Sequence, residues 1–385
     1  PAGLAAAWRA ARRGLKATLL ERADRVGGLA GSFEVAGQRV DHGSHRLHPS
    51  TPPRLIADLR NMLGPDLQTR PRNGRLRIEG RWIGFPLQAG ELTRELPPSM
   101  VAKVAGESVT APFRRPKNDT YAGVLKAGLG PTLYNSVYAP YAEKLWGLPG
   151  NKISSVQARR RVSADTAWKI AARVVGGRGD SSGKFFYYPR RGFGQIVEAL
   201  ADSASAAGAE IRLEAEVDSV RVFENEVVVG TQDGDTISAG FAFSTLPLPV
   251  LARIGRPAPS LADIESAARL RFRAMLLVYV VHRGGRWTSF DAHYIPGRET
   301  PITRISEPAN YRDSADDPTD RSVLCAEIPC AMTDEVWGLD DESLGDVVDE
   351  DVHRLIRGAV VAVGRRCLMA AVGAGGSDAG ETALG

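Results

Sequence analysis

The sequence predicts an α/β protein with two domains. Its 385 residues exceed the roughly 250–300 at which a single hydrophobic core stops growing, so two cores are expected. The first residues predict a helix, a glycine and a short strand ending in an acid, which is the order of the second half of a βαβ unit. Later segments alternate helical patterns with runs of strand length. We therefore expect one α/β domain and a second domain of α+β type.

Composition and charge are those of a globular protein. Hydrophobic residues make up 43% of the chain and charged residues 24%, which is typical of folded domains. The net charge is +4 without any block of five or more like charges, so we expect no nucleic-acid partner. No apolar run approaches the roughly 18–20 residues of a membrane span. We expect a cytoplasmic protein, with peripheral membrane contact as an open alternative.

The three cysteines, Cys325, Cys330 and Cys367, form no C-x-x-C pair. This favours a reducing compartment with ordinary buried thiols.

Residues 2–21 predict the helix and second strand of a Rossmann-like dinucleotide-binding domain. Apolar residues recur at helical spacing over 2–13, Gly14 is a typical helix end, and KATLLE at 16–21 is an apolar run closing on Glu21. Gly3 then takes the place of the third glycine of G-x-G-x-x-G, which allows close packing of helix on strand. Glu21 lies 18 positions later, near the spacing at which an acid holds a ribose hydroxyl. A carboxylate there repels a 2′-phosphate and favours FAD or NAD over NADP.

Both ends of the sequence have unusual features. The first strand and the first two glycines of this motif would lie upstream of residue 1, so we expect a truncated N-terminus. A leader peptide upstream also stays open. Residues 358–385 are rich in Gly and Ala without periodicity, and we expect an irregular or non-native tail there.

The stretch DRVGGLAGS follows the acid directly. Gly27 and Gly28 lack a Cβ, so the backbone there can pass close to a cofactor phosphate; an ordinary Gly-Gly turn is the alternative. Alternation in SFEVAGQRV then predicts a hairpin over 32–40.

The middle of the chain combines helices with one strand pair. Prolines before the first turn predict a helix over 51–63, and a Gly turn between apolar runs predicts two strands over 75–87. Residues 90–175 have helical patterns rich in Tyr and Trp and predict a mostly helical insertion. GGRGDSSGK at 176–184 is typical of a flexible linker.

The second half predicts further strands. A helix over 194–207 ends at Gly208. Strands are expected at 210–216, 218–223, 226–230 and 241–245, and later at 265–285 and 300–330, before an amphipathic helix over 340–357. The predicted FAD-binding domain then comprises 1–50 and 186–255, and the substrate domain comprises 51–185 and 256–357.

Several stretches together resemble a known family. LLERADRVGGLAGSFEVAGQRVDHGSHRLHP is similar to the N-terminal signature of FAD-dependent oxidoreductases of the protoporphyrinogen oxidase, amine oxidase and phytoene desaturase group: an acid, a spacer, Gly-Gly and a hairpin ending in D-x-G-x-H. It also resembles UDP-galactopyranose mutase, a relative that uses FAD. The likeness continues through 138–163, 186–200, 208–222 and 244–251 and covers most of residues 1–310.

The resemblance implies FAD as the cofactor and a set of residues that bind it. Glu21 would bind the adenosine ribose with Arg22 beside it, and Gly3 would belong to the phosphate loop. The pyrophosphate would lie along Gly27, Gly28 and Leu29, and the isoalloxazine would lie near Gly43, Ser44 and His45. Val217 would contact the adenine through its backbone, and Thr245 would border the cofactor. The first two loop glycines and the family's C-terminal glycine segment are absent from this sequence.

Two residues are candidates for catalysis. DHGSHRLHPS holds His42, His45 and His48, but their spacing in a Gly/Pro loop does not ensure that they converge, so we expect no metal site. His45 beside a flavin could hydrogen-bond the ring or carry a proton; a surface or capping role is the alternative. ITRISEPANY resembles a stretch of the sugar-converting relatives, which implies that Arg304 faces the site.

The function expected from these features is oxidation of a small organic substrate, porphyrinogen-, amine- or polyene-like, by hydride transfer to FAD. A mutase-like flavoenzyme that acts on a nucleotide sugar is the first alternative. A truncated binding relic without catalysis is the second. The sequence does not predict the oligomeric state.

Overall fold

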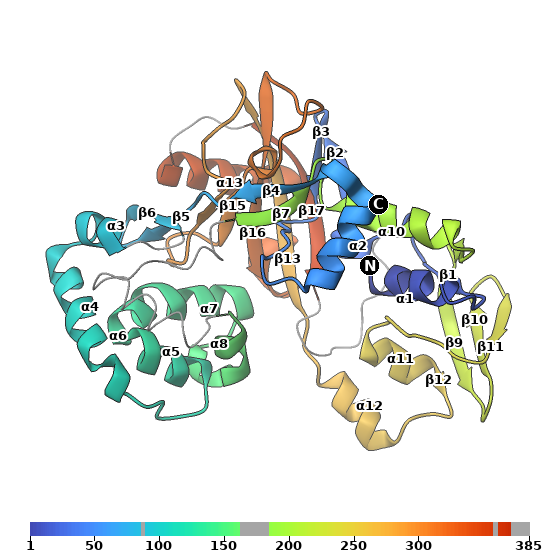
Figure 1. Cartoon of the computed structure of the whole chain (residues 1–385). Helices are drawn as coiled ribbons and strands as arrows, with labels where there is room; N and C mark the ends of the chain where they lie inside the picture. The colour runs from blue at the N-terminus through green and yellow to red at the C-terminus, as the bar shows by residue number, and fades with distance from the viewer. Residues whose placement is uncertain (86–88, 162–184, 357–360, 371–385) are drawn as a thin grey trace.

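The structure is a computed structural model that describes residues 1–85, 89–161, 185–356 and 361–370. Figure 1 shows a helical region on the left, a central sheet with a helix against it, and a region on the right that contains the start of the chain.

The region on the right contains the predicted βαβ half. Its core is two helices and a parallel strand pair: α1 (Ala2–Ala11), β1 (Thr18–Leu20), α10 (Gly194–Ala206) and β8 (Glu210–Arg212). Leu19 of β1 pairs with Ile211 of β8. Helices α1 and α10 pack through Leu4, Trp8 and Leu200, so segments nearly two hundred residues apart share one core.

A small sheet and two helices complete this region. The sheet order is β11-β10-β9-β12, with β9 and β12 parallel. The elements are β9 (Val217–Val222), β10 (Val227–Thr231), β11 (Thr236–Ala239), α11 (Leu248–Ile254), β12 (Gly255–Arg256) and α12 (Leu261–Ala268).

A hairpin and a second strand pair connect this region to the central sheet. Strands β2 and β3 form the hairpin, and β4 pairs antiparallel with β7. The elements are η1 (Gly28–Ala30), β2 (Ser32–Val35), β3 (Gln38–Asp41), α2 (Pro53–Leu63), η2 (Gly64–Asp66), β4 (Leu67–Pro71) and β7 (Phe185–Pro189).

The central sheet has seven strands in the order β17-β13-β16-β15-β14-β5-β6. All neighbours are antiparallel except β14 and β5. The elements are β5 (Gly74–Ile78), β6 (Arg81–Phe85), β13 (Arg273–Arg283), β14 (Ala292–Tyr294), β15 (Arg304–Ser306), η7 (Pro308–Tyr311), β16 (Arg321–Cys330), η8 (Glu335–Gly338), α13 (Asp341–Ile356) and β17 (Val361–Ala370).

Alternation along β13 gives the two faces of this sheet different neighbours. Leu276 and Val278 pack with Leu344 and Val348 of α13 on one face. Leu277 and Tyr279 pack with Val40 of the hairpin on the other face. The loop that follows the hairpin therefore lies against this second face.

The helical region is the predicted insertion, as far as the structure describes it. Its core includes Tyr121, Leu125 and Tyr134 and continues onto Leu76 and Ile83 of the sheet. The elements are α3 (Ala89–Glu95), α4 (Pro98–Thr110), η3 (Ala111–Phe113), α5 (Tyr121–Leu129), α6 (Pro131–Leu133), the π-helical turn η4 (Tyr134–Tyr138), α7 (Ala139–Trp146), η5 (Gly150–Lys152) and α8 (Ser155–Arg161).

The structure confirms the α/β class and most predicted elements. The helices expected over 2–13, 51–63, 194–207 and 340–357 and the hairpin over 32–40 all form. The predicted linker at 176–184 and most of the tail at 358–385 lie outside the described residues. The domain boundaries stay a prediction. Among the described helices, none has the length and apolar character to cross a bilayer.

Three expectations were wrong. Residues 241–245 join no described sheet, because the turn at Gly234 pairs β10 with Thr236–Ala239 instead. The strand expected from 265 begins only at Arg273, since Ser260 caps a helix by accepting a hydrogen bond from the Asp263 amide. Val361–Ala370, expected to be irregular, pairs with β13 over most of its length, so tertiary pairing overrides a weak local pattern.

Lys144 joins the helical region to the sheet. Its Nζ on α7 donates hydrogen bonds to the carbonyls of Ile295, Gly297 and Ile302, at 2.7, 2.8 and 2.6 Å. Burial lowers the pKa of Lys144 to about 8, although Glu299 and Asp351 raise it in part. One ammonium therefore satisfies three carbonyls of the segment between β14 and β15.

We predict that Lys144→Met lowers the free energy of unfolding by on the order of 3 kcal/mol, because three carbonyls lose their donor. Exposed Lys103→Met on α4 is the control and should change little. Between pH 8 and 10.5 the unfolded chain keeps the Lys144 proton and the folded chain loses it. Unfolding then takes up a proton, so wild-type stability rises with pH relative to Lys144→Met. Urea denaturation across this pH range measures the free energy of unfolding of both proteins. A difference between wild type and Lys144→Met that narrows with rising pH would contradict the prediction.

Candidate functional site

The start of α1 packs closely against β1 and the segment before α11. A Cβ placed on Gly3 would lie 3.3 Å from the Leu19 side chain and 3.9 Å from Thr245 Oγ1. The structure therefore brings Gly3 and Thr245, two predicted cofactor residues, side by side. The first turn of α1 has no side-chain cap, so its free backbone amides can stabilise an anion at the start of the helix.

Glu21 follows β1 directly and is fixed by backbone pairing. Its amide donates to the Arg212 carbonyl and its carbonyl accepts from the Ala215 amide, both at 2.9 Å. Its carboxylate accepts one bond, from the Ala23 amide at 3.1 Å. Arg22 beside it is exposed, and Val217 opens β9 just after Ala215. The acid is thus held at the end of β1 with acceptor capacity left for a hydroxyl.

The Gly-Gly turn passes close to α10. Gly27 has a φ of +118°, and a Cβ on it would lie 2.8 Å from Val197 of α10. Gly28 begins η1, and the next residue, Leu29, is 43% exposed. A side chain at Gly27 would force the turn away from α10, so this backbone position requires glycine.

Asp41 ends the hairpin and fixes the loop that follows it. Its Oδ1 accepts from Ser32 Oγ at 2.6 Å and from the Phe193 amide at 2.8 Å, and its Oδ2 accepts from Tyr188 Oη at 2.5 Å. Its carbonyl accepts from Tyr279 Oη at 2.6 Å. Burial raises the pKa of Asp41, and these side-chain bonds lower it in part. The carboxyl joins the hairpin, β7 and the start of α10, and the backbone carbonyl joins them to the sheet.

The loop Gly43–Ser44 lies on the central sheet. The Ser44 amide donates to Glu327 Oε1 at 3.0 Å, and Ser44 Oγ donates to Ser306 Oγ at 2.6 Å. The Gly43 amide donates to Tyr279 Oη at 3.3 Å. Two of the three residues predicted near the isoalloxazine are therefore anchored to three strands.

Arg304 faces this loop across a buried ion pair. Its Nε donates to Glu327 Oε2 at 2.9 Å and its Nη2 to Glu327 Oε1 at 2.6 Å. The same Nη2 reaches the Ser44 carbonyl at 3.5 Å. Arg304 and Glu327 are direct cross-strand partners on β15 and β16, so sheet register places both beside Ser44.

Arg46 carries a second buried positive charge at the site. It lies over the rings of Tyr311 and Phe186, at 4.4 and 4.9 Å, and its Nη1 donates to Asp291 Oδ2 at 3.0 Å. Burial raises the pKa of Tyr294, but Arg46, Arg304 and Arg72 lower it by more, so the pKa lies below its usual value. Three guanidinium groups therefore favour the ionised form of Tyr294.

The three histidines of the loop have separate partners. His45 Nε2 lies 2.9 Å from the His42 carbonyl, and its ring packs against Phe193 at 5.1 Å. The His42 ring lies against Phe33, and His48 Nδ1 lies 2.6 Å from Ser50 Oγ. These contacts direct His45 toward its own loop and α10, whereas Arg304 faces Glu327. In the described ranges no group of His, Cys, Asp or Glu is arranged to hold a metal ion.

Sequence reasoning missed the groups that position the loop. Of these groups, Glu327 was the easiest to predict from the sequence, because a carboxylate within the otherwise apolar strand VLCAEIPC requires a partner when buried. Asp291, Ser306 and Tyr279 carry no such pattern, since their roles depend on which strands lie side by side.

The residues present fit a dinucleotide cofactor. The amino end of α1 and the Gly27 turn offer close backbone approach suited to a diphosphate, and Glu21 offers a hydroxyl acceptor. Gly3 and Thr245 lie side by side at the start of α1.

We predict that Arg304→Met costs about 3 kcal/mol of folding free energy, because it leaves the buried Glu327 carboxylate without its cation. The control is Arg321→Met, which breaks an exposed pair with Asp320 and should cost less than about 1 kcal/mol. The double variant Arg304→Met/Glu327→Leu should recover most of the loss. Chemical denaturation measures all three, and equal costs for the two single variants would contradict a buried pair.

Comparison with protein families gives two matches. Residues 1–62 match an NAD(P)-binding Rossmann-like domain, and residues 137–367 match the flavin containing amine oxidoreductase family. Comparison with curated protein sequences finds no significant match.

Solved structures share the fold at low sequence identity. A reduced UDP-galactopyranose mutase superposes with a TM-score of 0.77 at 18% identity, covering 95% of this chain and 80% of that one. A putative protoporphyrinogen oxidase from Exiguobacterium sp. 255-15 gives 0.74 at 18% identity, covering 96% and 85%. Putrescine oxidase bound to putrescine gives 0.62 at 18% identity, covering 94% and 81%.

The amine oxidoreductase model spans more than half of the residues, and the Rossmann-like match covers the predicted βαβ half. The chain therefore belongs to the flavin-containing amine oxidoreductase family and is an FAD-dependent oxidoreductase.

Proposed function

We propose that this chain oxidises a small anionic organic substrate, of carboxylated porphyrinogen or polyene type, beside Ser44 and Arg304. The three guanidinium groups around Tyr294 are the observation that carries the substrate class. Arg304 lies 5.9 Å from the Tyr294 ring, and Arg46, Arg304 and Arg72 together hold the pKa of that tyrosine below its usual value although burial raises it. Carboxylate groups are attracted to these cations, and ammonium groups are repelled.

The acids near the site support the same substrate class. Glu327 is held by Arg304, and Asp291 is held by Arg46. A protonated amine would need a carboxylate as its partner, and both of these are already paired with guanidinium groups. An amine substrate is therefore less favoured than an anionic one.

FAD, when bound, accepts the two electrons and the hydrogen that leave the substrate carbon as a hydride equivalent. The chain's own residues hold the cofactor and orient the substrate. We propose that Gly3, Glu21, Arg22, Gly27, Gly28, Leu29, Val217 and Thr245 bind the dinucleotide and that Gly43, Ser44 and His45 border the flavin. Arg304, fixed by Glu327, orients the anionic end of the substrate.

His45 stays a proposed catalytic residue. Its Nε2 donates a hydrogen bond to the His42 carbonyl, which leaves Nδ1 of the neutral ring as the nitrogen that can take up a proton. The predicted cytoplasmic location and the peripheral membrane contact also stay predictions.

A mutase-like reaction on a nucleotide sugar is the second candidate. The same guanidinium groups suit a sugar diphosphate. The stretch that contains Arg304, ITRISEPANY, resembles the sugar-converting relatives. The two candidates differ in net redox change: oxidation consumes an acceptor with each turnover, whereas a mutase does not.

Anaerobic mixing of the FAD-loaded protein with substrates tests the proposal. We expect a carboxylated porphyrinogen to bleach the flavin absorbance, and we expect putrescine and other amines to leave it unchanged. Bleaching by amines but not by the porphyrinogen would overturn the anionic class. Conversion of UDP-galactofuranose without loss of acceptor would favour the mutase alternative.

The colour of the protein after incubation with FAD tests whether the chain is a binding relic. A protein that stays colourless after incubation with FAD would support a relic for this chain. A yellow protein with a flavin spectrum would exclude it.

We predict that Glu21→Ala weakens FAD binding about tenfold or more, because a ribose hydroxyl loses a charged acceptor. Asp24→Asn is the control, since Asp24 is exposed and pairs only with its neighbour Arg25 among the described residues. Titration of the apoprotein with FAD, followed by flavin fluorescence, measures both. Equal affinity of Glu21→Ala and wild type would remove Glu21 from the cofactor site.

A further inference from the structure

A pocket of about 240 Å³ lies next to the Arg46–Asp291 pair. Its lining includes Arg70, Arg286, Arg312, Asn73, Asp291 and Asn310. None of the proposed cofactor residues lines it. The pocket therefore lies outside the proposed cofactor residues and adjoins the loop after Ser44 through the Arg46–Asp291 pair.

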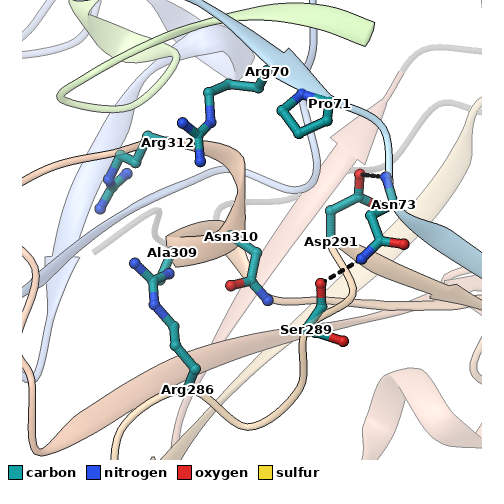
Figure 2. Close-up of a pocket in the computed structure, with 9 residues that line it drawn as sticks. All are labelled: Arg70, Pro71, Asn73, Arg286, Ser289, Asp291, Ala309, Asn310 and Arg312. Carbon is teal, nitrogen blue, oxygen red and sulfur yellow. Dashed lines mark hydrogen bonds between the residues drawn. The ribbon is translucent and has the colours of Figure 1, made fainter. Parts of the chain in front are cut away.

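Three arginines reach this pocket from different elements. Arg70 lies on β4, Arg286 follows β13, and Arg312 follows η7. Figure 2 shows their guanidinium ends on one side of the pocket, with Asp291, Asn73 and Ser289 on the other side. The fold thus gathers three cations that the sequence spreads over more than two hundred positions.

Two guanidinium groups keep unused donors. Arg312 is 2% exposed, and its Nε and Nη2 bind Asp317 and the Arg39 carbonyl. Its buried Nη1 has no hydrogen-bond partner in the described parts of the chain. The same holds for the buried Nε of Arg70. Buried donors without acceptors are costly, so a ligand acceptor that reached them would be favoured.

The charges around the pocket do not balance. Asp291 is paired with Arg46, and Asp317 is paired with Arg312 and lies 4.0 Å from Arg286. With Glu307 near Arg286, three carboxylates therefore lie among four guanidinium groups, those of Arg46, Arg70, Arg286 and Arg312. Glu307, the other acid near Arg286, is buried and accepts from the Trp287 and Thr288 amides at 2.8 and 3.0 Å. Arg70 has no carboxylate partner among the residues that the structure describes.

We propose that this pocket binds a phosphate group of a small ligand. A planar carboxylate presents its oxygens in one plane and matches one guanidinium fork. A phosphate is tetrahedral and presents acceptors in several directions, which matches three arginines arriving from three elements. The side-chain NH2 groups of Asn73 and Asn310 donate to backbone carbonyls, so these residues offer their amide oxygens as acceptors for hydroxyl groups of the rest of the ligand.

Calorimetric titration with inorganic phosphate tests the proposal. The protein is kept saturated with FAD, so that phosphate cannot occupy the cofactor's own phosphate site, and chloride keeps the ionic strength constant. We expect saturable binding and a rise of the melting temperature with phosphate concentration.

Arg70→Ala is the decisive variant. Because Arg70 pairs with no acid in the described chain and its buried Nε has no acceptor there, its removal should not lower the melting temperature without phosphate, while weakening phosphate binding about tenfold or more. Arg115→Ala, an exposed arginine outside the pocket, should bind as wild type does. Unchanged affinity in Arg70→Ala, or a response that chloride reproduces, would overturn the proposal.

Two further experiments distinguish a soluble phosphate ligand from a lipid headgroup. Glycerol 3-phosphate in solution should compete with inorganic phosphate if the ligand is soluble. Binding to vesicles containing phosphatidic acid, lost in Arg70→Ala and absent with neutral lipid, would place the phosphate on a lipid. Failure of every arm in the wild type would overturn the proposal and leave the FAD-dependent chemistry untouched.

Discussion

The buried carboxyl of Asp41 is the contact on which the site depends. It accepts bonds from the hairpin, from β7 and from the start of α10, and its carbonyl accepts a bond from Tyr279 on the central sheet. Three parts of the chain that are distant in sequence, the hairpin, the β7–α10 segment and β13, therefore meet at one residue. Gly43 and Ser44 follow directly, so the loop that lies on the sheet begins from a fixed point. The hydrogen bonds of Ser44 to Glu327 and Ser306 then hold the loop on the sheet.

Two ion pairs position the loop that follows Asp41. Arg304 and Glu327 are aligned by strand register and bind both the amide and the carbonyl side of Ser44. Arg46 extends the same loop to Asp291, which also lines the arginine pocket. The loop near the proposed flavin position and the proposed phosphate pocket thus share one ion pair. Guanidinium groups dominate both places, which gives the two sites a common preference for anions.

Local patterns predicted much of the fold because they depend on neighbours in sequence. The α1 helix, the β2–β3 hairpin and α13 follow from apolar periodicity and from glycine positions. Prediction failed where distant pairing decided the outcome. Val361–Ala370 has a weak strand pattern and forms an edge strand only because β13 offers it a partner. Residues 265–268 belong to a predicted strand, but the Ser260 cap makes them the end of a helix.

The sequence by itself determined the cofactor class, since Gly3, Glu21 and the Gly27–Gly28 turn lie within one short segment whose spacing is set by a single helix and strand. It also indicated Arg304 and the Gly43–His45 loop through resemblance. Only the tertiary structure decided that Glu327 holds Arg304, that Asp41 anchors the loop, and that Arg70, Arg286 and Arg312 share a pocket. These contacts join residues up to several hundred positions apart, and their geometry depends on strand order and register, which no local pattern encodes.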